Sequence, residues 1–132
     1  MARYRTDLAR ARGLGAAKHG AGHWLTERIT SIALAPLSVW GVFAALRLAS
    51  APDYGYAVEW LQQPANAVLL LLLLFVSFVH MHAGMRVIIE DYIERISTKA
   101  ALLLLNLAVC VVGGAVALFS VLKVALGGVG VF

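Results

Sequence analysis

Three long apolar stretches dominate the chain, covering residues 29–48, 66–89 and 101–126. Each has roughly 20 or more residues, enough at about 1.5 Å of rise per residue to cross a hydrocarbon core about 30 Å thick. The segments between them, 49–65 and 90–100, are short. The pattern predicts an all-α membrane protein with three transmembrane helices that run up, down and up.

The composition supports a membrane location. Of the 132 residues, 61% are hydrophobic and 14% are charged, whereas a soluble domain has about 45–50% apolar and about 25% charged residues. One small unit is expected, with residues 1–28 as an N-terminal tail and helix start and residues 29–132 as a three-helix membrane domain. The single cysteine, Cys110, lies in an apolar run, so it is interpreted as a packing residue.

The basic residues are distributed unequally between the two ends of the predicted helices. Six of the 11 lysines and arginines lie in residues 1–28, three lie at or near the second connection, and only Arg47 and Lys123 lie at the other side. The positive-inside rule therefore predicts a cytoplasmic N-terminus and 90–100 loop, with the C-terminus outside. A bacterial inner membrane is expected, with the mitochondrial inner membrane as the less favoured alternative. The basic charge is thus a topology signal, and no nucleic-acid partner is expected.

Some features of the apolar stretches indicate packing rather than chemistry. Trp24 and Trp60 fall near the ends of predicted spans, as an aromatic belt predicts, whereas Trp40 lies deeper and is expected to pack inside. In the third span, Gly113 and Ala117 form a small-xxx-small pair that would let another helix approach closely.

The stretch HMHAGMRVIIEDY, residues 80–92, places polar groups in a membrane helix. His80 precedes Asp91 by eleven residues, so it is about 16 Å deep and close to the bilayer midplane. Almost three helical turns separate the two, so His80, Gly84 and Asp91 share one stripe of the helix. His82 lies about 200° around the helix from His80 and cannot serve the same ligand.

The spacing alone leaves three interpretations of His80 open. A midplane histidine can form a structural hydrogen bond between helices, ligate a haem, or belong to a proton or ion path. Gly84, one turn away on the same face, leaves an open surface beside the imidazole, which a flat macrocycle needs and a proton relay does not. Asp91 and Tyr92, taken alone, are typical of a solvated helix end and an aromatic belt.

The same stretch resembles the second-helix signature of the smaller hydrophobic anchor subunit of succinate dehydrogenase, respiratory complex II, of the form H-x-x-x-G-x-x-x-x-x-x-D-Y. His80, Gly84, Asp91 and Tyr92 occupy its four marked positions. The run from Lys18 to Leu37 is similar to the start of that family's first helix, with Arg28 at its basic position. The resemblance covers about residues 15 to 105.

The resemblance implies an anchor that pairs with a second cytochrome b-type anchor, each supplying one axial histidine to a shared b-type haem. His80 is the ligand it implies, and thus the metal-binding residue for the haem iron. It implies a quinone beside Tyr92 and Asp91, with Arg28 near the haem propionates or the quinone entrance. Arg86 departs from the expected uncharged residue, and both a propionate contact and snorkelling to the headgroups stay open for it.

The resemblance also implies partners that hold the remaining cofactors. A flavoprotein with FAD and an iron–sulfur subunit with its clusters would dock on the cytoplasmic face and pass electrons from succinate to the quinone. This chain alone is expected to have no dehydrogenase activity, because it has no phosphate-binding loop, zinc ligand pair or nucleophile–base motif. The rival hypothesis is a small transport or assembly subunit in which His80 and Asp91 form a proton path without haem.

Overall fold

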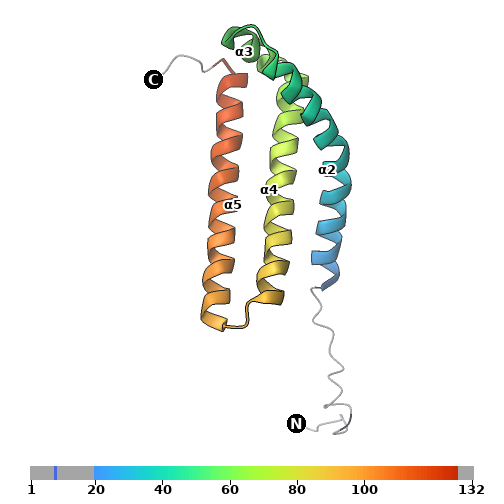
Figure 1. Ribbon diagram of the computed structural model, residues 1–132, viewed down its shortest axis with the longest axis vertical. Coiled ribbons are helices and arrows are strands. Elements are labelled where there is room, and N and C mark those ends of the chain that lie inside the picture. The colour runs from blue at the N-terminus through green and yellow to red at the C-terminus, as the bar shows by residue number, and fades with distance from the viewer. Residues whose placement is uncertain (1–7, 9–19, 128–132) are drawn as a thin grey trace, which may run out of the picture.

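The computed structural model describes residues 8 and 20–127, and these described residues form helices without a strand (Figure 1). The helices are α2 (Gly20–Ala49), α3 (Tyr54–Gln62), α4 (Pro64–Tyr92) and α5 (Ile96–Ala125). Three of them are long and apolar enough to span a membrane. The all-α fold with three long apolar helices is therefore confirmed. Of the predicted N-terminal tail and helix start over residues 1–28, residues 1–7 and 9–19 lie outside the described residues.

The long helix α4 lies in the middle of the molecule and packs against α2 on one side and α5 on the other (Figure 1). The start of α2 and the α4–α5 turn lie at one end, and α3 lies at the opposite end near the start of α4. The chain thus runs up, down and up, as the apolar pattern predicts. The row of three helices leaves two broad faces that other helices of the same chain do not cover.

The helices extend beyond the apolar runs that predict them. The three candidate spans contain 26, 29 and 30 residues, which corresponds to about 40–45 Å at 1.5 Å per residue. This length exceeds a hydrocarbon core of about 30 Å, so the helix ends reach the headgroup region. Polar residues continue a helix there, because the backbone hydrogen bonds persist where the side chains meet water. Hydropathy therefore marks the membrane-buried part of each helix and not its full length.

The short helix α3 was not predicted; it lies within the connection between the first two spans. Asp53 caps its start by accepting a hydrogen bond from the Tyr56 backbone N–H at 2.8 Å, which satisfies one of the free amides of the first turn. Trp60 in α3 is only 6% exposed and stacks on Trp40 of α2, with 6.1 Å between ring centroids and 20° between ring planes. The belt assignment of Trp60 is therefore wrong, because this tryptophan packs α3 onto α2.

Small residues make the contacts between the long helices. Those that are buried include Ala44, Ala67, Ala83, Cys110 and Gly114, and close approach through small residues is typical of membrane helices. No large side chain among the described residues is fully buried. The molecule is therefore a thin layer that depends on lipid or on other subunits to cover its apolar faces.

Two close contacts fix how the long helices meet. A Cβ added at Gly113 would lie 3.2 Å from the Phe78 ring of α4, and one at Gly114 would lie 3.4 Å from it. A Cβ at Gly41 of α2 would lie 2.8 Å from Leu73 of α4. The glycine surface of α5 thus receives an aromatic ring from the neighbouring helix of the same chain.

Candidate functional site

His80 faces α2 and is partly buried. Its Nδ1 lies 2.9 Å from the Oγ1 atom of Thr30, which is 9% exposed. The Thr30 hydroxyl is also within donating distance of two carbonyl oxygens of its own helix, at 2.7 Å from Thr26 and 3.1 Å from Glu27. The imidazole is therefore held through one nitrogen by the first membrane helix. Its Nε2 makes no hydrogen bond within residues 8 and 20–127.

The surface beside His80 is open at Gly84. A Cβ built on Gly84 would meet nothing within 4 Å. Gly84 lies about 40° around the helix from His80 and one turn away, so the open surface adjoins the imidazole. A flat group that enters from outside this chain could lie against the helix backbone here.

His82 faces the opposite way and contacts α5. Its Nδ1 lies 3.1 Å from the Asn106 side-chain nitrogen, which also donates to the His82 backbone carbonyl at 3.1 Å. Asn106 is 9% exposed, and its Oδ1 accepts from the Cys110 thiol at 3.4 Å. These three side chains form a polar contact between α4 and α5 in an otherwise apolar setting.

Asp91 and Tyr92 close the last turn of α4 and are exposed, Tyr92 to 80%. Neither side chain makes a hydrogen bond to another residue in the described part of the chain. Asp91 continues the stripe of His80, whereas Tyr92 lies about 120° around the helix from His80. Both polar groups are thus available to a molecule or subunit that approaches the end of the bundle.

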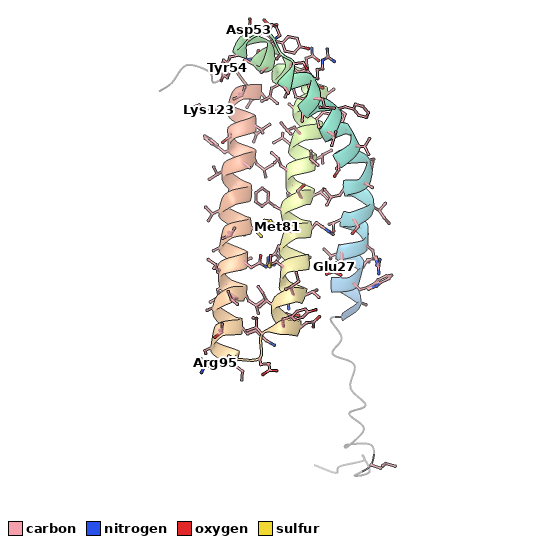
Figure 2. The ribbon with its side chains drawn as sticks, viewed as in Figure 1. Glu27, Asp53, Tyr54, Met81, Arg95 and Lys123 are labelled. Carbon is pink, nitrogen blue, oxygen red and sulfur yellow. The ribbon has the colours of Figure 1, made fainter. Side chains whose placement is uncertain are left out.

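Tyr92 lies at the end of an apolar groove between α4 and α5. The groove encloses about 370 Å³ and includes Met81, which lies between the two helices (Figure 2). Besides Tyr92, the groove is lined by Met81, Met85, Ile88, Ile89, Ile93, Leu102, Leu105, Asn106 and Val109. An apolar molecule that moves within the bilayer could reach the Tyr92 hydroxyl along this surface.

The two predicted arginines are not brought to His80. Arg28 is two residues before Thr30, so it leaves α2 about 200° around the helix from the residue that contacts His80. Its guanidinium lies 5.5 Å from the centroid of the Trp24 ring, a cation–π contact. Arg86 forms an exposed ion pair with Glu90, at 2.7 Å between Nε and Oε1. Both arginines are near the same end of the molecule as Tyr92.

Sequence reasoning missed Thr30 and Asn106. Each is a polar side chain in a long apolar run, and such residues in membrane helices usually face another helix. That signal was available for both positions. The pattern could not show which histidine each would contact, because this depends on how the three helices pack.

A single imidazole is not a complete metal site. The described ranges contain no group of three or more histidine, cysteine, aspartate or glutamate side chains placed to hold a metal ion. Iron bound at His80 would therefore need its other ligands from a macrocycle and from outside the described part of the chain. The fold and the site define a class of protein: a multi-pass helical membrane protein with polar contacts between its helices and with Asp91 and Tyr92 exposed at one end.

The family model for the succinate dehydrogenase/fumarate reductase transmembrane subunit matches residues 2–121. Among similar proteins, the succinate dehydrogenase hydrophobic membrane anchor subunit of Rickettsia conorii is 36% identical over 83% of this chain and 86% of its own length. The anchor subunit of Rickettsia bellii is 33% identical over 98% of this chain and 94% of its own length. The chain belongs to the succinate dehydrogenase/fumarate reductase transmembrane subunit family. The resemblance seen in residues 80–92 is thereby confirmed.

Proposed function

We propose that this chain is the membrane anchor subunit of a succinate dehydrogenase, and that it holds a b-type haem jointly with a second anchor subunit and contributes to the quinone-reduction site. The observation that carries the proposal is the environment of His80. This imidazole is fixed to α2 through Nδ1, it lies beside the open backbone of Gly84, and it belongs to a chain that matches the anchor family over almost its whole length.

The residues present fit a haem. His80 would hold the haem iron through Nε2, and Gly84 would leave room beside the imidazole for the macrocycle without a side-chain clash. A haem held by two histidines would supply one-electron transfer rather than oxygen activation. As the family resemblance implies, the second ligand would come from the partner anchor; His82 faces α5. Arg28 and Arg86 are the cations of this chain that would meet the propionates or line the quinone entrance.

The quinone is reduced at the end of α4. Tyr92 donates its phenolic proton in a hydrogen bond to a quinone carbonyl oxygen, and Asp91 stands beside it at the same helix end. Adding electrons places negative charge on the quinone oxygen, so a donor already aimed at that oxygen stabilises the charge as it develops. The groove between α4 and α5 suits an apolar substrate that arrives from the membrane.

The remaining chemistry lies in partner subunits. A flavoprotein with FAD oxidises succinate, and an iron–sulfur subunit passes the electrons to the quinone and docks where Asp91 and Tyr92 are exposed. The Lys and Arg asymmetry supports a cytoplasmic location for this end in a bacterial cell, with the C-terminus outside. Reporter fusions test the orientation, because a cytoplasmic C-terminus contradicts it.

A proton path without haem has less support. His80 and Asp91 lie about 16 Å apart along α4. The residues between them on the same stripe are Gly84 and Val87, which carry no group able to relay a proton. The open surface at Gly84 likewise has no role in such a path.

The test is to purify the intact complex from its native membrane through an affinity tag on this chain. The proposal expects a flavoprotein, an iron–sulfur protein and a second helical anchor to co-purify. It also expects a sharp b-type absorption band after reduction and succinate-dependent reduction of a quinone. A colourless complex, or partners of unrelated classes, would contradict the proposal.

A further inference from the structure

The two histidines of α4 meet different hydrogen-bond partners, and those partners determine which ring nitrogen carries the proton. A neutral imidazole has one N–H donor and one bare nitrogen, and only the bare nitrogen can bind a metal. Identifying the donor in each contact therefore identifies the nitrogen that is free to ligate.

The Thr30 hydroxyl has one proton and three polar neighbours. Two are the carbonyl oxygens of Thr26 and Glu27, at 2.7 and 3.1 Å, and a carbonyl can only accept. A threonine in a helix characteristically gives its proton to such a carbonyl of the preceding turn. The third neighbour is His80 Nδ1 at 2.9 Å, so the hydrogen between these two atoms belongs to the imidazole. His80 thus carries its proton on Nδ1, and Nε2 is bare.

The arrangement at His82 is the reverse. The Asn106 side-chain amide has two hydrogens, and acceptors lie at 3.1 Å for each, the His82 backbone carbonyl and the His82 Nδ1. Exchanging the oxygen and nitrogen of this amide would set two carbonyl oxygens against each other and would leave the Cys110 thiol without its acceptor. His82 Nδ1 therefore accepts, and its proton lies on Nε2, where it blocks ligation.

We propose that Thr30 is a positioning residue for the haem ligand: its hydroxyl oxygen holds His80 in the tautomer and ring orientation that present Nε2 to the iron. This inference rests on the proposed haem function. A hydrogen-bond acceptor behind a ligating histidine also makes the ring a stronger electron donor, and loss of such a partner typically costs 10–100-fold in metal affinity.

The experiment uses the whole complex, purified through this chain, with Thr30→Val and Thr30→Ser. Valine keeps the shape of threonine and removes the hydroxyl, whereas serine keeps the hydroxyl and removes a methyl group. The proposal expects Thr30→Val to lower the haem content per flavin by roughly tenfold or more when haem is limiting. It also expects a more positive midpoint potential of the remaining haem, because a weaker donor stabilises ferric iron less, and changed g values of the ferric haem in electron paramagnetic resonance.

Thr30→Ser should retain the haem content, potential and spectrum of the unmodified complex. A role of Thr30 in packing alone predicts the opposite order, with valine normal and serine perturbed, and that result would overturn the inference. If Thr30→Val does not assemble, Thr30→Ser is compared with Thr30→Ala, a pair that differs only by the hydroxyl. Equal potentials and spectra in that pair would also overturn it.

Asn106→Leu provides the matched control on the other side of α4. It removes the partner of His82 and should leave the haem content, potential and spectrum unchanged. A shifted haem potential in this variant would show that the potential responds to helix packing in general, and it would contradict the specific role of Thr30. Absence of b-type haem from the unmodified complex is a different result, because it overturns the proposed haem function itself.

Discussion

The two sides of α4 use the same residue type for different purposes. On the α2 side, His80 is tethered by Thr30 and borders the open surface of Gly84. On the α5 side, His82 is tethered by Asn106, and the neighbouring glycine surface of α5 is filled by the Phe78 ring. On the α5 side, both the histidine and the glycine surface are therefore contacted from within the chain, although apolar grooves remain between α4 and α5, whereas the backbone at Gly84 is not covered by the described residues. The difference shows that a polar residue in a membrane helix is identified by what surrounds it rather than by its depth.

The largest effect is expected from replacing the two histidines of α4 one at a time. His80→Leu should abolish the b-type haem spectrum of the purified complex, because it deletes the ligand that the proposal assigns to the open side. His82→Leu should keep a six-coordinate haem, since His82 lies toward α5. Absorption spectra of the reduced complexes measure both. The reverse pattern would move the ligand to His82, and unchanged spectra in both would exclude α4 as the source of the ligand.

The comparison extends to the end of α4, where Asp91 continues the His80 stripe and Tyr92 borders the groove toward α5. Tyr92→Phe keeps the ring and its packing but deletes the hydroxyl. Quinone reduction should slow by roughly 10²-fold or more, the scale for removing one preorganised donor. Electron transfer from succinate to an artificial acceptor that draws on the soluble subunits should persist and serves as the control.

Asp91→Asn in the same assay should slow quinone reduction in the same direction, with an added effect on docking of the iron–sulfur subunit. An interfacial tyrosine without a chemical role would tolerate phenylalanine. Normal quinone reductase activity in an assembled Tyr92→Phe complex would therefore remove Tyr92 from the site.

The open and closed glycine surfaces can be compared by filling each. The Cβ of Gly84→Leu would meet no atom of the described residues within 4 Å, so the chain should accumulate in the membrane at its normal level. The haem should bind more weakly by about 1–3 kcal/mol, the usual cost of overpacking, or roughly 5- to 150-fold in affinity.

Gly113→Leu is the matched substitution on the filled glycine surface of α5, where the Phe78 ring would lie 3.2 Å from the new Cβ. This variant should lower the amount of folded chain itself. Immunoblots of membranes and haem content per chain separate the two outcomes. A normal haem content in Gly84→Leu would show that nothing packs against this surface.

The smallest effect is expected at the polar contact between α4 and α5. Asn106→Leu removes the hydrogen bonds between α5 and His82 and should destabilise the complex by about 0.6–2 kcal/mol, the range for hydrogen bonds between membrane helices. Thermal denaturation of the purified complex measures the loss. An unchanged midpoint of denaturation would mean that the Asn106 contact contributes little and that apolar packing alone joins α4 to α5.

The number of membrane spans and the angle between the two histidines around α4 follow from the sequence alone. Apolar runs long enough to cross a bilayer can only be helices there, because no water is present to satisfy the backbone of an extended chain. A helix turns about 100° per residue, so the step of two positions from His80 to His82 places them on different faces whatever the helices pack against. The stripe of His80, Gly84 and Asp91 follows from the same periodicity.

What each face of a helix contacts depends on how the helices pack against one another. Thr30 and His80 are 50 residues apart, and Asn106 and His82 are 24 apart, so no local pattern pairs them. The same is true of Trp40 and Trp60, whose stacking turned a predicted belt residue into a packing residue. A helix's own periodicity specifies directions around its axis, whereas the tautomer of a histidine depends on a donor or acceptor that another helix brings within about 3 Å, and that distance exists only once the helices have packed.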